Sequence, residues 1–184
     1  MLFKRFYKLV LMALLGFSAC IEVPTATAKK DLAFFDLKNY FNEEIKNLSR
    51  IKQVKKSVAI NGVIEELVKD SLNFEEELSV FLDSDINRVA WIDKYKVDSL
   101  NTNGQLQSIT YSALDEKLKT QSLIINYKNN QVDQISIKNN HTSLVSDSAQ
   151  ELEYRVEKGY TVVSRQNTTI TDERLLKVHV EFLY

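Results

Sequence analysis

The chain has 184 residues, of which 44% are hydrophobic and 27% charged, and its formal net charge is −1 at pH 7. Without a basic excess, nucleic-acid binding lacks its main driving force, so a nucleic-acid partner is excluded. The chain has only four glycines, one proline and one cysteine, which excludes glycine-rich phosphate loops and a disulfide framework within the chain.

The first 19 residues have the layout of a secretory leader. Lys4, Arg5 and Lys8 give a basic start, and an apolar run of 11 residues, 9–19, follows. A helix needs about 20 apolar residues to cross the hydrocarbon of a bilayer. A cleaved leader is therefore favoured over a permanent membrane anchor.

Cys20, the sole cysteine, follows this leader directly, after Phe17, Ser18 and Ala19. The ending resembles a bacterial lipoprotein signal in the relaxed form of Bacteroidota, with Phe17 where the usual form has leucine. The resemblance implies cleavage before Cys20 and attachment of acyl chains such as palmitate, each buried methylene contributing about 0.8 kcal/mol of membrane binding. Ile21, rather than aspartate, implies sorting to the outer membrane. The alternative is an incidental cysteine beside an ordinary cleavage site.

Cleavage at this point divides the chain into a signal peptide (1–19), a lipidated tether (20–30) and one globular domain (31–184). The leader carries three of the 24 basic residues and none of the 25 acidic ones, which leaves 21 basic residues and a formal charge of −4. Small and polar residues without a period over 21–30 predict a flexible tether with a reach of roughly 15–20 Å.

An amphipathic helix is predicted after Asp36, which is a typical capping residue. Apolar residues recur at three- and four-residue spacing on one face: Leu37, Tyr40, Phe41, Ile45 and Leu48. We expect this face to pack on a core. The alternative is a helix on a membrane surface, although its polar face mixes charges instead of being rich in lysine.

A β-hairpin is predicted over 54–60 and 63–68, because Asn61-Gly62 is the strongest two-residue turn signal. In this register Ile60 faces Val63. The alternative is one long helix over 64–82, whose apolar positions also fit a helical stripe.

A second helix is predicted over 74–82, since Asn73 with Glu76 resembles a capping box. The segment 83–87, Asp-Ser-Asp-Ile-Asn, begins like a calcium-binding EF-hand loop. Arg88 and Lys94 stand where that loop needs glycine and glutamate, so we expect only a turn at the helix end.

After Trp91 the apolar period changes to two. We expect strands around 94–98, 108–111, 123–127 and 132–137, a long or bent strand over 154–162 through Gly159, and a final strand over 176–184. Turn-like segments separate them at 101–104, 115–117, 129–130, 139–150 and 166–172. The predicted fold class is α+β: an antiparallel sheet of about six to eight strands, a meander, covered by two N-terminal helices.

No catalytic site, metal site or cofactor is predicted. The only histidines are His141, in an expected loop, and His179, on the polar face of the last strand. The cysteine is consumed by lipid, and no Gly-x-Ser-x-Gly elbow is present. An enzyme is therefore not expected.

Two weaker features remain. Trp91, Tyr95 and Tyr111 are candidates to line an apolar pocket, with ordinary packing of helix on sheet as the alternative. Three tripeptides, at 70–72, 98–100 and 147–149, resemble the O-glycosylation acceptor of Bacteroidota, and Ser148 in the last of them is placed in an expected loop.

The stretch 36–97 is similar to an uncharacterised family of Bacteroidota lipoproteins, through Asn73-Phe74-Glu75, Asp85-Ile86-Asn87 and Ala90-Trp91. That resemblance implies an address in the cell envelope and no activity. We therefore expect a membrane-anchored, non-enzymatic interaction or structural domain with an envelope protein as partner. The alternatives are a carrier of a lipid or other apolar ligand, and a hydrolase.

Overall fold

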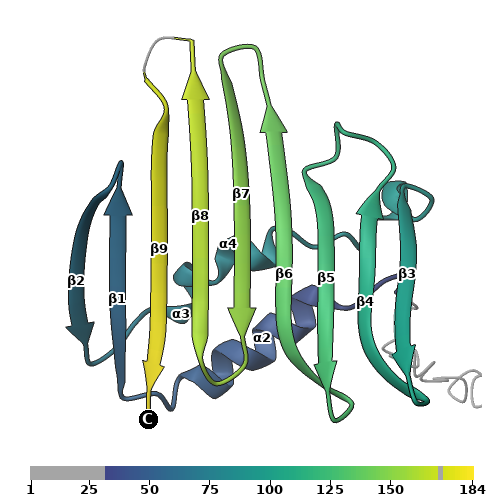
Figure 1. The fold of residues 1–184 in the computed structure, drawn as a ribbon, viewed down its shortest axis with the longest axis horizontal. Helices are drawn as coiled ribbons and strands as arrows, with labels where there is room; N and C mark the ends of the chain where they lie inside the picture. Colours follow the sequence, from purple (N-terminus) through teal and green to yellow (C-terminus); the bar gives the residue numbers. More distant parts are fainter. Residues whose placement is uncertain (1–31, 170–171) are drawn as a thin grey trace, which may run out of the picture. The chain divides into compact units, whose positions relative to one another are not determined.

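The computed structural model describes residues 32–169 and 172–184. They form one antiparallel sheet of nine strands, with short helices from the N-terminal half lying on one of its faces (Figure 1). The fold class is α+β, as predicted. The predicted signal peptide, the tether and Cys20 lie outside the described residues.

The elements have these bounds. The helices are α2 (Leu37–Leu48), α3 (Phe74–Glu77), α4 (Ser79–Leu82) and the 3₁₀ turn η1 (Val89–Trp91). The strands are β1 (Gln53–Ile60), β2 (Val63–Lys69), β3 (Tyr95–Thr102), β4 (Gln105–Ala113), β5 (Thr120–Lys128), β6 (Gln131–Thr142), β7 (Ser146–Arg155), β8 (Gly159–Thr168) and β9 (Arg174–Leu183).

The strand order in the sheet is β2-β1-β9-β8-β7-β6-β5-β4-β3. Strands β3 to β9 form the predicted meander. The hairpin β1–β2 is added beside β9, so the first and the last of the described strands pair with each other. The sheet thus has nine strands where six to eight were expected, and the β1–β9 pairing joins segments that no local sequence pattern connects.

Helix α2 confirms the predicted amphipathic helix. The carboxylate of Asp36 accepts a hydrogen bond from the backbone N–H of Asn39 at 3.1 Å, which satisfies a free donor of the first turn. Leu37, Phe41 and Leu48 are buried under the helix. Because this stripe packs on the sheet, it is not available to a membrane surface.

The segment predicted as one helix over 74–82 forms two short helices, α3 and α4. Leu78 between them has φ −94° and ψ 1°, which interrupts the regular helix. The side-chain oxygen of Asn73 accepts a hydrogen bond from the N–H of Glu76 at 3.4 Å, so the predicted cap is present.

The predicted hairpin is confirmed, and the alternative of a long helix over 64–82 is wrong. Asn61 and Gly62 have φ of 48° and 89°, the positive values that a type I′ turn requires, and Ile60 pairs with Val63. The Asn61 side chain also accepts a hydrogen bond from the N–H of Leu175 at 2.8 Å, which ties the turn to β9.

Two sequence-based boundaries are wrong. The strand expected to run through Gly159 is a hairpin, in which β7 ends at Arg155 and β8 begins at Gly159. The expected turn over 139–150 is mostly strand, because β6 continues to Thr142 and β7 begins at Ser146. Of the expected turn over 166–172, residues 166–168 belong to the end of β8, and the remaining described residues lie between β8 and β9. These strand ends consist mostly of polar residues, so they show no apolar alternation.

Aromatic rings fill the space between the helices and the sheet. Phe41 of α2 packs against Phe81 of α4 and Tyr154 of β7, with ring centroids 5.0 and 5.2 Å apart. Phe74 of α3 meets Phe182 of β9 edge-on at 5.9 Å. Each such ring buries roughly 150–250 Å² of largely apolar surface, so this cluster is the main attachment of the helices to the sheet.

Among the residues that the structure describes, no helix combines the length and the apolar character needed to cross a membrane.

Candidate functional site

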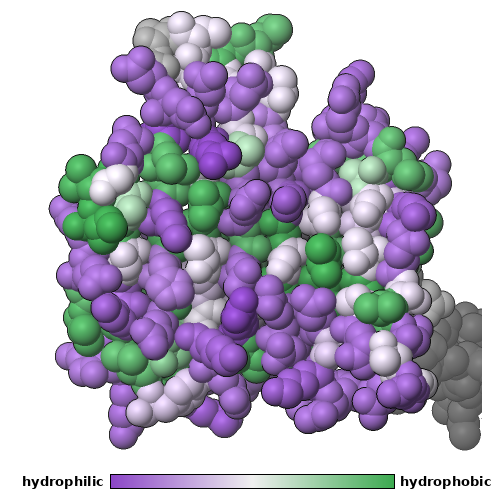
Figure 2. All heavy atoms as spheres, viewed as in Figure 1, coloured by the Kyte–Doolittle hydropathy of each residue, from purple (hydrophilic) through white to green (hydrophobic). Residues whose placement is uncertain are grey.

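The two faces of the sheet differ in their cover. The helices lie on one face, and the face turned toward the viewer in Figure 1 is open. Figure 2 shows that this open face is largely hydrophilic. Its exposed charges pair across and along strands, as in Lys138–Glu151 at 3.8 Å and Lys96–Asp98 at 2.9 Å. Such exposed ion pairs contribute little to the free energy of folding. The open face therefore presents a surface of mixed charge that is not needed to hold the domain together.

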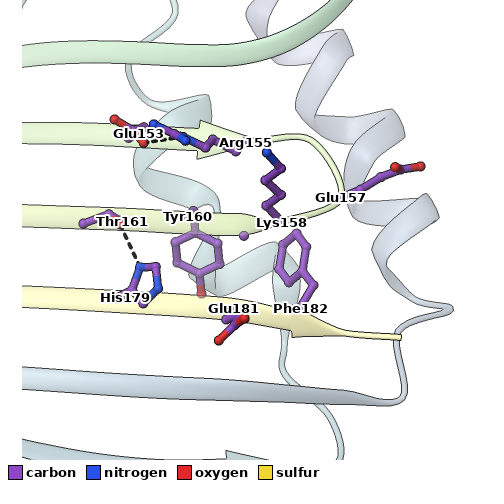
Figure 3. Close-up of a pocket in the computed structure, with 10 residues that line it drawn as sticks. Glu153, Arg155, Glu157, Lys158, Tyr160, Thr161, His179, Glu181 and Phe182 are labelled. Atoms are coloured by element: carbon purple, nitrogen blue, oxygen red, sulfur yellow. Dashed lines mark hydrogen bonds and ion pairs between the residues drawn. The ribbon is translucent and has the colours of Figure 1, made fainter.

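A hollow of about 460 Å³ lies where β7, β8 and β9 meet at the lower end of the open face (Figure 3). Its lining residues come from these strands and from the turn 156–158. They are Glu153, Arg155, Glu157, Lys158, Gly159, Tyr160, Thr161, His179, Glu181 and Phe182.

Gly159 is the lining residue at which β8 and β9 approach most closely. It has φ +139°, and a Cβ placed there would lie 1.9 Å from the carbonyl oxygen of Val180 on β9. Only glycine allows β8 and β9 to approach this closely at the start of the hairpin. Gly159 pairs with Arg155 on one side and with Glu181 on the other, so it lies between these two charged residues in the sheet.

Two polar pairs border the hollow. The guanidinium Nε of Arg155 lies 2.7 Å from a carboxylate oxygen of Glu153, and Thr161 Oγ1 lies 2.9 Å from His179 Nδ1 (Figure 3). These groups offer donors, acceptors and both signs of charge to a polar surface. No group of three or more His, Cys, Asp or Glu side chains within the described ranges could hold a metal ion.

Trp91, Tyr95 and Tyr111 are brought together, but around another ring. Phe34 packs edge-on against Tyr95 and Tyr111, with centroids 5.7 and 5.5 Å apart, and Trp91 lies 6.4 Å from Tyr95. The Tyr111 hydroxyl accepts a hydrogen bond from the N–H of Phe35 at 3.1 Å. The arrangement matches the alternative of helix-to-sheet packing, with the segment before α2 occupying the predicted pocket.

The segment that resembles a calcium loop is a polar joint between α4 and the sheet. The hydroxyl of Thr120 donates to the carbonyl of Ser84 at 3.0 Å, and the amide of Asn139 donates to the Ser84 hydroxyl at 2.8 Å. Asn87 donates to the carbonyl of Phe35 at 2.8 Å. These bonds engage Ser84 and Asn87 of this segment in contacts that join the helix end to the rest of the domain.

Two helix carboxylates hold buried tyrosines of the sheet. The Tyr154 hydroxyl donates to Glu44 of α2 at 2.6 Å, and the Tyr160 hydroxyl donates to Glu77 of α3 at 2.7 Å. Burial raises the pKa of both tyrosines, and the neighbouring carboxylates raise it further. Glu77 also binds Lys56 of β1. These residues are structural, and neither the tyrosines nor their partners were singled out from the sequence.

The remaining sequence candidates lie on strands. His141 is in β6 and not in a loop, exposed beyond the helices, while His179 is on the open face as expected. Ser148 is inside β7, paired with His141 and Gln166, so the expectation of a loop at this position is wrong. The prediction of O-glycosylation at Ser148 therefore loses the mobile context on which it depended.

One surface was missed by the sequence analysis. Strand β2, at the edge of the sheet, is exposed along its whole length although it contains Val63, Ile64, Leu67 and Val68. The signal was present in the sequence, because the strand has apolar residues in both alternating sets. None of the described helices or strands covers them.

No protein-family model matches the chain, and neither the curated proteins nor the solved structures gave a match to it.

Proposed function

We propose that the chain is an envelope lipoprotein, anchored by lipid at Cys20, whose folded domain is a non-enzymatic interaction module. The open face of the sheet is its contact surface, and an envelope protein is its partner. The observation that supports this most is the uncovered, charge-paired face with the hollow over Gly159. Protein surfaces of mixed polarity with precise hydrogen-bonding groups suit a reversible contact more than a buried, permanent one.

A carrier function has weaker support. A lipid held between the helices and the sheet would need the space that Phe41, Phe81 and Tyr154 fill with rings in mutual contact. Native mass spectrometry of the protein purified from cells separates the two functions. A co-purified lipid would favour the carrier, whereas an unliganded mass is expected for the interaction module.

The anchor is tested by metabolic labelling with an alkyne fatty acid. Label is expected on the native chain and absent from Cys20→Ala. An unlabelled native chain would remove the proposed membrane address without affecting the interaction surface.

The contact surface is tested by placing a photo-crosslinking amino acid at Thr161, on the open face, in intact cells. We expect one discrete protein adduct, reduced by Glu151→Lys on the same face. Lys38, exposed on the outer side of α2, is the matched control and should give no such adduct. Adducts that are equal from both positions would contradict the proposal.

A further inference from the structure

Strand β2 is an exposed edge of the sheet. It is the first strand in the sheet order, so no described strand lies on its outer side. Val63 and Ile64, on opposite faces, are 71% and 64% exposed, and Leu67 and Val68 are 38% and 58% exposed. Figure 2 shows hydrophobic side chains along this edge of the molecule, over β1 and β2. An edge of this kind is a template for pairing with another strand.

The geometry of the β1–β2 turn determines which backbone groups of β2 point away from β1. The N–H of Asn61 donates to the carbonyl of Leu175 in β9 at 2.9 Å, so odd-numbered residues of β1 bond to β9 and even-numbered ones to β2. Ile60 therefore bonds to Val63, as a two-residue turn requires. By alternation, the N–H and C=O groups of Ile64, Glu66 and Val68 point away from the sheet.

The opposite edge is less regular. The register of β3 against β4 shifts between Leu100 and Asn101. A bulge on an edge strand discourages pairing with another strand. The β1–β2 register is continuous over its whole length, so β2 has a regular, extended edge.

We propose that β2 pairs in antiparallel fashion with β2 of a second copy of this chain, about a twofold axis at Leu67. The twofold axis is perpendicular to the sheet, so the helix-covered faces of both copies lie on the same side of the joined sheet. Side chains directly opposite each other must then point to the same face, so odd-numbered residues face odd-numbered ones and even-numbered residues face even-numbered ones. Centred on Leu67, the pairing sets Leu67 against Leu67, and Glu65 against Lys69 twice.

Neighbouring registers oppose like charges. An axis at residue 65 sets Glu65 against Glu65, and an axis at residue 66 sets Glu66 against Glu66. An axis at residue 68 sets Glu66 against Asp70. Like charges directly opposite each other destabilise a sheet. The charge pattern of β2 is therefore complementary to itself in the register centred on Leu67, which favours a second copy over an unrelated strand as the occupant.

The complementary residues also occupy the closest positions. Because Glu66 and Val68 carry the outward hydrogen-bonding groups, Leu67 and the Glu65–Lys69 pairs stand at non-hydrogen-bonded positions. Cα atoms there are about 4.5 Å apart, closer than at hydrogen-bonded positions. The Leu67–Leu67 and Glu65–Lys69 pairs therefore occupy the positions at which opposite side chains come closest.

Disulfide trapping tests the axis directly. Leu67→Cys places its thiol opposite the same residue of the partner, within the Cα separation of about 4.4–6.8 Å that a disulfide requires. In the full chain, expressed in cells and oxidised mildly, we expect a covalent dimer from Leu67→Cys on a non-reducing gel. Leu100→Cys on the opposite edge is the control and should stay monomeric, as should the native chain, which has only Cys20.

The register is tested by two further cysteines. Glu65→Cys and Lys69→Cys should each remain monomeric when expressed alone and should form a mixed disulfide when co-expressed. If Leu67→Cys stays monomeric, or if Glu65→Cys alone cross-links, the proposed axis is overturned. The first result would leave a foreign strand as the occupant of this edge, and the second would place the axis of the two copies at residue 65.

Charge reversal provides a test without cysteines. Sedimentation velocity of the full chain in mild detergent should show a monomer–dimer equilibrium. Lys69→Glu and Glu65→Lys should each raise the dissociation constant about tenfold or more, since each makes two opposed pairs alike in charge. Mixing the two variants should restore a heterodimer, because Glu then faces Lys at both positions. A dimer indifferent to both changes, or none at any concentration, would overturn the proposal.

Discussion

At the scale of single residues, the tyrosines of the sheet attach the helices that cover it. Tyr154 and Tyr160 each combine a buried ring with a hydroxyl that reaches a helix carboxylate at 2.6 and 2.7 Å. The ring contributes apolar burial, and the hydroxyl selects the position of the helix along the sheet. Tyrosine thus contributes both apolar contact between the helices and the sheet and a hydrogen bond that fixes where each helix lies on the sheet.

Removing one hydroxyl should therefore destabilise the domain measurably. Tyr154→Phe leaves the Glu44 carboxylate without its donor, and a hydrogen bond to a charged group is worth about 1.5–3 kcal/mol. We expect the free energy of unfolding in urea to fall by about that amount. Tyr184→Phe, at an 84% exposed position, is the control and should have no effect. Equal urea midpoints for the two variants would show that the Glu44 bond contributes nothing.

Stability should also fall at high pH. Burial raises the pKa of Tyr95 from its ordinary value near 10 to about 12, and its hydroxyl donates to the carbonyl of Thr120 at 2.7 Å. Between these two values the unfolded chain has lost the proton and the native chain keeps it. The unfolded state then binds fewer protons, so the free energy of unfolding decreases as the pH rises from 10 to 12.

This dependence is measured by urea unfolding at several pH values above 9. Tyr95→Phe should be less stable at neutral pH and should show a shallower decrease between pH 10 and 12. A slope that is identical in the variant would assign the alkaline loss to other groups.

At the scale of elements, the β7–β8 hairpin depends on one glycine. Gly159→Ala brings a Cβ to 1.9 Å from a backbone oxygen of β9, where no flexible side chain can yield. We expect a loss of about 3 kcal/mol or more in the free energy of unfolding. Gly104→Ala is the matched control: its φ is also positive, at +76°, but nothing lies within 4 Å, so about 1 kcal/mol is expected. Equal losses would mean that backbone conformation alone, and not the approach of β9, requires glycine at position 159.

The turns show which elements could be predicted from sequence. Asn61-Gly62 and Asn129-Asn130 predict turns between strands, because asparagine and glycine readily adopt the positive φ observed there. The β7–β8 turn has Glu157 at φ 60°, a residue with no such preference, so Gly159 was interpreted as a bend within one strand. Turns are therefore predictable from the sequence where the turn residues themselves favour a positive φ. A turn that depends on pairing with neighbouring strands has no such local signal.

Strand ends and the candidate site were less predictable for a related reason. Apolar alternation exists only where one face is buried, so the polar ends of β6, β7 and β8 carry no periodic signal. The hollow over Gly159 depends on the close approach of β9, which follows from pairing across the sheet. Similarly, the packing of Phe34 between Tyr95 and Tyr111 joins residues far apart in the chain.

At the scale of the whole molecule, β9 joins two parts of the sheet. It pairs with β1 on one side and with β8 on the other. Deleting residues 174–184 would separate the β1–β2 hairpin from the meander and expose Val54, Tyr160 and the rings beneath α3. We expect this truncation to abolish cooperative unfolding and to make the chain sensitive to protease.

Deletion of Tyr184 alone is the control for this truncation. Its side chain is largely exposed and it lies beyond the end of β9, so a native protease-resistance pattern is expected. A truncated chain that still unfolds cooperatively would show that the meander is stable without its last strand.

The place of β9 also fixes when the domain can be finished during biosynthesis. The ribosome makes β1 before β2 to β8 and makes β9 after all the other described strands, so this sheet cannot close until β9 has been made. Such distant partners meet slowly, because a long loop must be closed first. A chain that is stalled or prematurely terminated would keep both edges of its first hairpin bare. Quality-control proteases and holding chaperones could thus distinguish a chain that lacks β9 from one that has it, because only the former leaves the outer edge of β1 unpaired.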